Sequence, residues 1–559
     1  MSRVSVLEKA WATVAPIHAT KRAAAKKMLP FINSGYGNYG ANQTKKSMRG
    51  WEYYGGSEKE DIEDNIDVLR QRSRDAYMGI PTASAALKTL RTNVVAGGLV
   101  PAPQIDAEYL GLTDDEAEEL QGAIMREFSI WADSPTCDAE RMDNFYQLQQ
   151  LAFLSYLMSG DAIVLLPVKQ QAGQPYDLRI RLIEADRVCS PNGMDRLTPC
   201  EVQGYKVHQI VQGVETDSDG MVVAYWICNR HPLSSTAYLT QPGGIEWVRV
   251  EAYSKETGRR NVLHIMNRER PGQRRGVPIL APVLESLKQM GRYTEAEITA
   301  AVISAMFTVF VNSQNPSDGV PFGEMLPPEM QIDHEDENSI ELGPAAIVSL
   351  NPGEDVKFAD PKHPSSGFDT FCDAVIKQIG AALEIPQEIL FKQFCTSYSA
   401  ARGALNEFWR TCAMQRDWFK DDFCKPIYEE WLAEAVAKSR VEAPGFFIDP
   451  AIKKAYCACA WSGPARTNLN PVQEIDAAIK RIDAGISTAQ EETATMTGGD
   501  WNRNIRQRVI EAKRKKEVDD ITNQPTGMPQ QPMQPMQRPP REPEEDGQEQ
   551  RQRQTTVGA

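Results

Sequence analysis

Two segments of the chain carry apolar residues at helical spacing, and an acidic, Pro/Gly-rich insert separates them. Apolar side chains that recur every three or four residues form one face of a helix. We therefore predict two long helices that carry a small β-containing insert, which suits a mechanical part better than an enzyme core. The segments are Gly276–Phe310, with Val283, Leu284, Leu287, Met290, Ile298, Val302, Ala305, Met306 and Val309, and Phe368–Leu383, with Phe368, Phe371, Val375, Ile379 and Leu383.

After an apolar helix expected at Tyr146–Met158, the pattern changes to period two and to β-branched residues, which is typical of strands. The DSDG sequence at Asp217–Gly220 indicates a hairpin turn. Asp217 and Asp219 also resemble calcium ligands, but the other positions of an EF-hand loop are missing. The pattern predicts an α+β fold with strands at Asp161–Pro167, Asp177–Glu184, Val202–Val211, Met221–Arg230 and Ile245–Val250.

Further helices follow from local signals. Pro81 and the Gly97-Gly98 pair bracket one helix, and a run of acidic residues from Asp114 favours the start of the next. Pro386 ends the second long helix, and a polar stretch, Lys392–Arg402, precedes a new one. These later helices are predicted at Ala404–Lys438, Pro471–Ala484 and Asp500–Val518.

The two ends of the chain differ in composition from the rest. Residues 1–50 carry nine Lys and Arg against Glu8 alone, which predicts a basic flexible arm over residues 1–60. An N-terminus with no specific role is an equally good reading of the same residues. Residues 523–559 are rich in Pro and Gln and are expected to form a disordered tail.

Length and charge limit the function. The 559 residues predict two to four domains. A formal net charge of −15 argues against tight binding of nucleic acid, which depends on Lys and Arg that neutralise phosphates. The longest apolar run, Ala300–Val311, is too short for a membrane span, and no signal-peptide pattern is seen, so we expect a soluble chain in the cytoplasm.

No catalytic or metal-binding pattern appears in the sequence. The ten cysteines include no CxxC pair, so reduced structural thiols are expected. The HEDE run from His334 is better explained as an acidic loop than as a metal site. Phosphate-loop, GxSxG and HExxH motifs are also missing. The sequence therefore predicts neither an enzyme nor a cofactor.

A basic loop leads into the first long helix. It contains Arg268, Arg270, Arg274 and Arg275 around a Pro271-Gly272 turn. The four arginines either form a small positive cluster for a partner or make salt bridges between domains or subunits. The sequence leaves both interpretations open.

At this loop the chain resembles the lambda-like family of phage portal proteins. The resemblance rests on ERPGQRRGVPILAPVLESL at Glu269–Leu287 and LEIPQEILFKQFCTSYSAARGALNEFWR at Leu383–Arg410. The AYMGIPTA helix, GDAIVLLP at Gly160–Pro167 and NPGEDVKF at Asn351–Phe358 occur in the family's order. Together these motifs cover about residues 61–516.

The resemblance implies a fold with a wing, a stem, a clip and a crown. By position, residues 61–275 are an α/β wing, 276–311 and 367–390 the helical stem, and 312–366 a small β-containing clip. Residues 391–405 correspond to a channel-facing tunnel loop, 406–467 to a helical return to the wing, and 468–522 to the helical crown.

The resemblance also implies a function. Twelve subunits would form a ring at one capsid vertex, and double-stranded DNA would enter and leave through this ring. Twelve chains with a net charge of −15 each would give the ring a total charge of about −180. The implied partners are the terminase large subunit, head–tail adaptors, and the major capsid and scaffold proteins, with assembly in the host cytoplasm and no membrane. The alternative is another ring-forming phage structural protein, such as a tail adaptor or a shell component. The residues implied to contact DNA are Lys392, Gln393, Tyr398, Ser399 and Arg402. An ordinary loop at the start of a helix is an equally good interpretation of that stretch. The residues implied to dock a partner are Glu324, Glu335, Asp336 and Glu337.

Overall fold

The computed structural model describes residues 55–234, 244–305, 309–312, 347–350, 368–393, 397–465 and 471–522, with residues 17, 21, 41 and 45–51. The chain divides into two compact units, 1–498 and 499–559. The second unit contains the helix α17 (Trp501–Thr522), which confirms the helix predicted at Asp500–Val518. All elements named below belong to the first unit.

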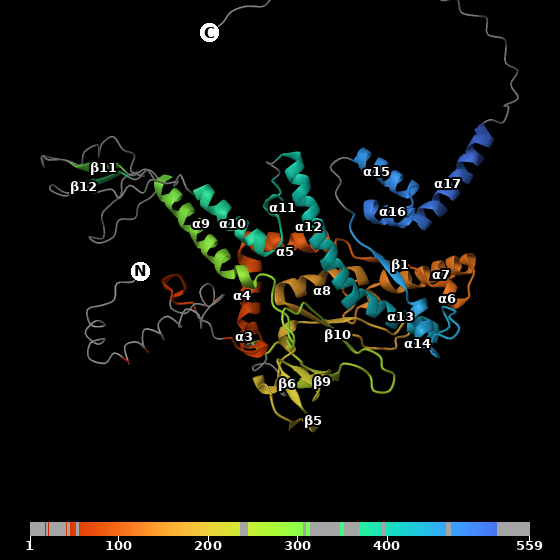
Figure 1. The fold of residues 1–559 in the computed structure, drawn as a ribbon, viewed down its shortest axis with the longest axis horizontal. Helices are drawn as coiled ribbons and strands as arrows, with labels where there is room; N and C mark the ends of the chain where they lie inside the picture. The colour runs from red at the N-terminus through yellow and green to blue at the C-terminus, as the bar shows by residue number, and fades with distance from the viewer. Residues whose placement is uncertain are drawn as a thin grey trace, which may run out of the picture. The chain divides into compact units, whose positions relative to one another are not determined.

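Helices dominate the first unit (Figure 1). Several of them begin where a polar side chain caps the first turn. Thr113 and Glu116 form a reciprocal capping box at the start of α7, and Asn144 and Gln147 form another at α8. These side chains satisfy backbone N–H groups that lack a partner within the helix. The helices are α3 (Glu58–Asp61), α4 (Ile66–Gly79), α5 (Pro81–Val94), α6 (Ala107–Leu110), α7 (Asp114–Ala132), α8 (Phe145–Ser159), α9 (Leu284–Ala305), α10 (Phe368–Ala382), α11 (Gln387–Phe391), α12 (Tyr398–Phe419), α13 (Lys425–Ala437), α14 (Pro450–Tyr456), α15 (Pro471–Asp483) and α16 (Ala489–Thr497).

The strands form small sheets that are antiparallel except for one pair. Two larger sheets have the orders β10-β2-β3 and β6-β7-β8-β9, and the pairs are β1-β13, β4-β5 and the parallel β11-β12. The strands are β1 (Val100–Pro103), β2 (Asp161–Leu165), β3 (Arg181–Ile183), β4 (Cys200–Val202), β5 (Tyr205–Val207), β6 (Gln209–Val211), β7 (Val214–Thr216), β8 (Val222–Cys228), β9 (Trp247–Glu251), β10 (Val262–Met266), β11 (Val309–Asn312), β12 (Ile347–Leu350) and β13 (Cys459–Ser462). The fold is therefore α+β, as predicted.

The predicted turn between β7 and β8 is confirmed. The Asp217 carboxylate accepts hydrogen bonds from the backbone N–H groups of Asp219 at 3.0 Å and Met221 at 2.8 Å. This is the hydrogen-bonding pattern of a turn in which an aspartate side chain replaces a backbone acceptor. The Asp217 side chain thus has a structural role in this turn.

The single strand predicted at Val202–Val211 is wrong, because a two-residue turn splits it. Gln203 and Gly204 have φ angles of 49° and 82°, so the chain reverses between β4 and β5. Gln212 and Gly213, at 47° and 80°, make the same kind of turn between β6 and β7. Positive φ at both central residues is what a tight hairpin requires. The strands predicted from Asp161, Met221 and Ile245 are confirmed as β2, β8 and β9.

A cluster of aromatic side chains unites segments from before and after the two long helices. The Phe128 ring of α7 lies 5.5 Å from Phe145 of α8 and 4.9 Å from Trp431 of α13, centroid to centroid. The Glu434 carboxylate of α13 also accepts hydrogen bonds from two backbone N–H groups, at Asp177 and Leu178. The segment after the long helices therefore folds back onto the α/β body and shares its core.

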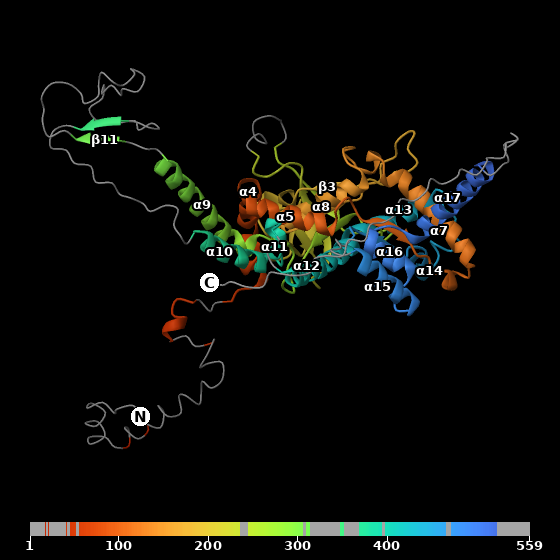
Figure 2. The same cartoon turned by 90° about the horizontal axis from the view of Figure 1, so that it is seen from above.

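The two long helices predicted from periodicity are α9 and α10, which lie side by side (Figure 2). The bounds predicted for the first, Gly276–Phe310, are wrong at both ends, because α9 begins only at Leu284 and Val309–Phe310 belong to the strand β11. Tyr293 of α9 contacts Phe368 and Phe371 of α10, with ring centroids 5.3 and 5.2 Å apart. At the end nearer the body, Leu287 of α9 and Ile379 of α10 are buried in the main core. One end of each helix is thus anchored in the body.

The helix predicted at Ala404–Lys438 begins earlier and changes its pitch once. Ser397 caps its start by accepting a hydrogen bond from the Ala400 N–H at 3.4 Å. A π-helical segment, Lys420–Cys424, then joins α12 to α13. Pro426 accounts for this segment, because proline has no N–H and its ring would clash with the carbonyl four residues earlier in an α-helix.

Candidate functional site

Residues from two of the sequence motifs, joined by Arg70 and His264, meet at one buried carboxylate, Asp161, the first residue of β2. Arg275 Nε donates to its Oδ2 atom over 2.6 Å, and Arg70 Nη2 donates to the same oxygen over 3.0 Å. His264 Nε2 lies 3.4 Å from this oxygen, and the Gly276 N–H donates to it over 3.4 Å. Asp161 and Arg275 are fully buried. This cluster links α4, β2, β10 and the start of the α9 segment.

Charge compensation sets the protonation states in the cluster. Burial alone would raise the pKa of Asp161, but the guanidinium groups of Arg275 and Arg70 outweigh burial and hold this pKa below its ordinary value. Burial, and then repulsion by Arg275, lowers the pKa of Arg70 to about 10. Burial also lowers the pKa of His264, against the attraction of Asp161, so its imidazole is neutral at pH 7. An ionised aspartate therefore sits between two charged arginines.

Two glycines bring the backbones on either side of this cluster into contact. Gly160 ends α8 with a φ of 87°, a left-handed conformation that favours glycine. A Cβ atom added at Gly276 would lie 1.9 Å from the carbonyl oxygen of Gly160, and one added at Gly160 would lie 2.4 Å from the carbonyl oxygen of Gly276. No side chain fits at either position. Gly160-Asp161 of one motif and Arg275-Gly276 of another are thus in direct contact just before the start of α9.

The arginine loop makes intrachain contacts at three of its four positions. Arg275 donates to the carbonyl oxygens of Val188, Gln212 and Ala185 in addition to Asp161. Arg270 Nη1 lies 2.7 Å from Asp61 Oδ2, and the Arg274 backbone N–H donates to the Glu63 carboxylate. Arg268 is exposed. The structure thus places Arg270 and Arg275 in bridges within one chain, and Arg275 is not an exposed partner contact.

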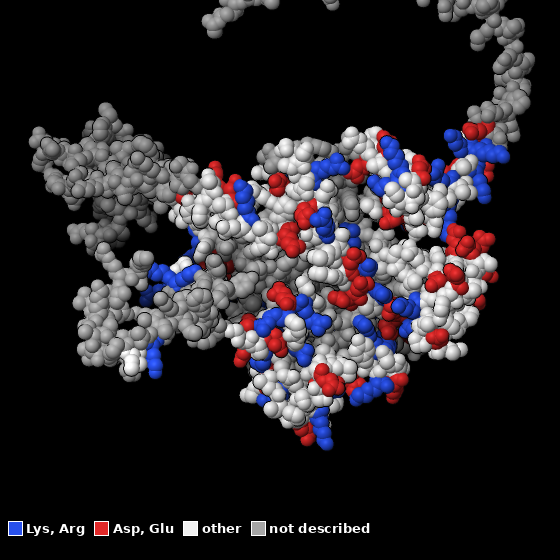
Figure 3. Space-filling model, in the orientation of Figure 1, with Lys and Arg blue, Asp and Glu red and all other residues white. Residues whose placement is uncertain are grey.

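Charges on the described surface of the body are mixed in sign. On the face shown in Figure 3, acidic and basic side chains are interspersed over the helices and sheets. Several form ion pairs, such as Arg440 with Glu127 at 2.7 Å and Arg259 with Glu430 at 2.9 Å. Charges paired in this way are compensated within the chain.

The apolar stripes of α9 and α10 are buried at one end and exposed at the other. Leu287 is 0% exposed and Ile379 is 1% exposed, whereas Ile298 is 60%, Val302 50% and Phe371 53% exposed. Large apolar side chains that recur along one helix face and remain open to solvent mark an interaction surface. Part of the apolar surface of both helices is therefore not covered by other described residues.

The residues implied for DNA contact lie just after α11 and in the first turns of α12. Lys392 caps the C-terminus of α11 in a left-handed conformation, φ 56°, and the Gln393 N–H donates to the Glu388 carbonyl. Tyr398 and Ser399 begin α12, and Arg402 follows one turn later. The loop predicted to continue to residue 405 is therefore wrong, because Ser397 supplies a helix cap that the polar composition of the stretch concealed.

Arg402 is exposed, and its Nη2 atom lies 3.9 Å from Glu474 Oε1 of α15. Both side chains are more than a third exposed, so this pair is worth at most about 1 kcal/mol. The guanidinium group is thus available for a second partner. Lys392, Gln393 and Ser399 are also exposed.

The four acidic residues expected to dock a partner, Glu324, Glu335, Asp336 and Glu337, lie outside the described residues. Of the insert itself, the structure describes the strand β12, which pairs in parallel with β11 at the end of the preceding segment. The HEDE run also lies outside the described residues.

Sequence patterns did not single out Arg70 or His264 of the buried cluster. Arg70 is one of several polar residues in α4 and His264 is a single polar residue in β10, and nothing local shows that a carboxylate from β2 will meet them. A second group, Glu184, Asp186 and His231, is the one set of metal-ligand types that comes together in the part of the chain that the structure describes. Arg74 already pairs with both carboxylates there, so the geometry favours an ion pair.

None of the helices in the described part of the chain is long and apolar enough to cross a membrane. The described cysteines are free, and most are buried. Burial raises the pKa of Cys137, Cys412 and Cys457 to about 12, which makes them poor nucleophiles. These thiols are structural, as expected.

Comparisons with known proteins agree with the motifs. Residues 44–416 match the family model described as phage portal protein, lambda family. The chain is 22% identical over 431 residues to portal protein B of Escherichia phage lambda, covering 73% of this chain and 76% of that one. It is 20% identical over 488 residues to the portal protein of Escherichia phage N15, covering 84% and 88%.

Among solved structures, a chain from the neck of a native gene transfer agent particle is 13% identical to this one, with a TM-score of 0.36. That similarity covers 77% of this chain and 92% of that chain. The family match spans well over half of the sequence, and the related proteins are named as portal proteins. The chain therefore belongs to the lambda family of phage portal proteins, which are structural components of the virion, form ring oligomers and are not enzymes.

Proposed function

We propose that twelve copies of this chain form a closed ring at one capsid vertex, and that double-stranded DNA is packaged and ejected through its channel. The observation that carries the proposal is the exposed apolar surface of α9 and α10 around Ile298, Val302 and Phe371. In a head-to-tail ring, each copy covers this surface on its neighbour. The stem in this proposal is 276–311 with 367–390, between a wing at 61–275 and a clip at 312–366.

Substituting both Ile298 and Val302 by aspartate is expected to prevent ring assembly while the chain stays folded. Exposed positions usually change stability by no more than about 0.5 kcal/mol. Two carboxylates buried at every interface, in contrast, would have no compensating partner. Sedimentation velocity, run beside a thermal melt, measures both effects.

The matched control is Met221→Asp, at a turn of the body where the side chain is 64% exposed. The control is expected to assemble normally. Rings formed by the double variant would contradict the assignment of this surface to subunit contacts.

We propose further that Lys392, Gln393, Tyr398, Ser399 and Arg402 face the DNA in the channel. Support comes from the exposure of Lys392 and Arg402 at adjacent helix ends in a chain whose net charge is −15. On an otherwise acidic wall, isolated cations are the nearest partners for phosphates. A few such contacts hold DNA in place without gripping it.

The double variant Lys392→Ala and Arg402→Ala is expected to form normal rings and shells that retain less DNA. Arg410→Ala is the control on the same helix, because Arg410 is highly exposed and pairs only with Glu407 among the described residues. DNA content per particle is measured after nuclease treatment. Wild-type DNA content in the double variant would contradict the channel assignment.

The clip residues Glu324, Glu335, Asp336 and Glu337 are proposed to dock the terminase large subunit during packaging and a head–tail adaptor afterwards. This part of the proposal is supported by the acidic composition of the insert, which complements a basic partner surface. Residues 468–522 are proposed as the crown. Contacts with the major capsid and scaffold proteins are proposed for the ring as a whole.

A further inference from the structure

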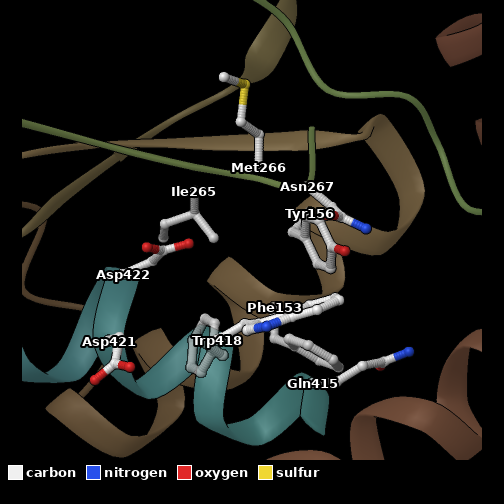
Figure 4. A pocket seen from close by; sticks show the side chains of 10 residues that line it. Phe153, Tyr156, Ile265, Met266, Asn267, Gln415, Trp418, Asp421 and Asp422 are labelled. Carbon is white, nitrogen blue, oxygen red and sulfur yellow. The ribbon is translucent and has the colours of Figure 1, made fainter. Parts of the chain in front are cut away.

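A cavity of about 330 Å³ lies beside the π-helical segment, away from the residues proposed for ring assembly and DNA contact. Its walls come from α8, from β10 and the residue after it, and from the end of α12 with the π-helical segment that follows it (Figure 4). Aromatic and apolar side chains make up most of these walls. The lining residues are Phe153, Tyr156, Ile265, Met266, Asn267, Gln415, Trp418, Phe419, Asp421 and Asp422.

The aromatic rings that line the cavity differ in their exposure to solvent. Phe153 and Phe419 are buried, with ring centroids 5.3 Å apart. Trp418 is 44% exposed, which is unusual for so large an apolar side chain. In Figure 4 the Asp421 and Asp422 carboxylates lie on one side of the cavity, and the Tyr156 hydroxyl and Asn267 amide lie on the other. The cavity thus combines aromatic faces with polar groups at its edges.

The carboxylates of Asp421 and Asp422 have no ion-pair or hydrogen-bond partner among the described residues. Burial, and then repulsion from Asp421, raises the pKa of Asp422 to about 6, although Arg260 and Arg268 oppose the shift from a distance. Neither arginine approaches either carboxylate closely enough to form an ion pair. Neither carboxylate is therefore compensated by a direct contact with a cation among the described residues.

A second, independent feature of the cavity is an unpaired buried oxygen. Gln415 is only 9% exposed, and its Oε1 atom has no hydrogen-bond partner among the residues that the structure describes. A buried acceptor of this kind costs free energy unless a donor reaches it. The free acceptors of Gln415, Asp421 and Asp422 point to a ligand that donates hydrogen bonds.

We infer that this cavity binds an organic cation, an ammonium or guanidinium group carried on an apolar stem. The cation would pair with Asp421 and Asp422 and lie against the ring of Trp418, whose face attracts positive charge. Its stem would contact Ile265 and Met266, and an N–H group would reach Gln415 Oε1. An anion would be repelled by the carboxylates, and an uncharged apolar ligand would leave them unpaired.

Two sources could supply this chemistry: a free diamine, or an arginine side chain of a neighbouring copy in a ring. The test is isothermal titration with putrescine and with N-acetylarginine methylamide. Each probe is added to assembled wild-type protein and to the Ile298→Asp, Val302→Asp chain. Binding to both forms assigns the site to a free cation. Binding to the unassembled chain alone assigns it to the side chain of a second copy.

Asp422→Asn is expected to weaken binding of either probe about tenfold, because it removes one charge-assisted hydrogen bond. Trp418→Leu, at an exposed position, is expected to weaken binding without lowering the melting temperature. Asp417→Asn is the control, since Asp417 is an exposed neighbour outside the cavity.

Failure of both probes to bind either form would overturn the inference. So would unchanged affinity in both cavity variants, or binding of Mg²⁺ with no binding of the organic cations. Each of these outcomes is separate from ring formation, so the failure of this inference and the failure of the proposed function are distinguishable.

Discussion

Asp161→Asn is expected to lower the free energy of unfolding by about 3–5 kcal/mol, because it leaves two buried guanidinium groups without their counter-ion. Arg275 and Arg70 both donate to the lost carboxylate at 3.0 Å or less. Neither arginine can move into water, since both are buried. The amide also presents N–H donors to groups that already donate.

Denaturant unfolding of the unassembled chain, followed by tryptophan fluorescence, measures this loss. Asp67→Asn is the control, since Asp67 is exposed and lies 3.9 Å from Arg70. The control is expected to cost less than about 1 kcal/mol. A loss that small for Asp161→Asn would show that the cluster does not stabilise the base of α9.

The same cluster predicts a pH dependence. The pKa of Asp161 is lower in the folded chain than in the unfolded chain, where it is about 3.9. Its stabilisation is therefore fully present above about pH 4 and is lost as pH falls toward the lower, folded pKa. The difference in stability between the wild type and Asp161→Asn is expected to stay constant at neutral pH and to shrink in acid.

Gly276→Ala is expected to cost about 3 kcal/mol or more, because the added methyl group would lie 1.9 Å from the Gly160 carbonyl oxygen. Both contacting groups are backbone, so the clash cannot be relieved by a change of side-chain rotamer. The base of α9 would have to separate from β2, and this would strain the Asp161 cluster as well.

Gly291→Ala is the matched control within α9, where an added Cβ meets no atom within 4 Å. Alanine is the better helix former, so the control is expected to stabilise the chain by about 0.5–1 kcal/mol. Opposite signs in the two variants, measured by denaturant unfolding, would support the direct contact between Gly160 and Gly276. Equal effects would contradict it.

Local pattern was enough to predict the long helices and several strands. The apolar periodicity of α9 and α10 indicates a helix face that packs against other residues. These residues can belong to the same chain or to another copy. The periodicity could not distinguish buried Leu287 from exposed Ile298, because both are apolar positions of one helix. Strands such as β13 were missed because their partners, here β1, lie far away in the sequence.

The candidate sites show the same limit. Arg268 and Arg275 look alike in the sequence, yet one is exposed and the other is buried against Asp161, since only the folded chain brings β2 to the loop. The sequence predicts a loop at Ser397, because a serine acts as a helix cap only where the residues after it form the first turn of a helix. The cavity beside Asp422 had no sequence signal, because its walls come from three separated segments.

Native mass spectrometry of the purified chain tests most directly whether it builds a ring. Twelve copies of a 62.3-kDa chain give a closed assembly of about 748 kDa. The predicted result is one dominant species at that mass, stable on dilution and absent from the Ile298→Asp, Val302→Asp variant. A wild-type chain that stays at 62.3 kDa at high concentration would contradict the account.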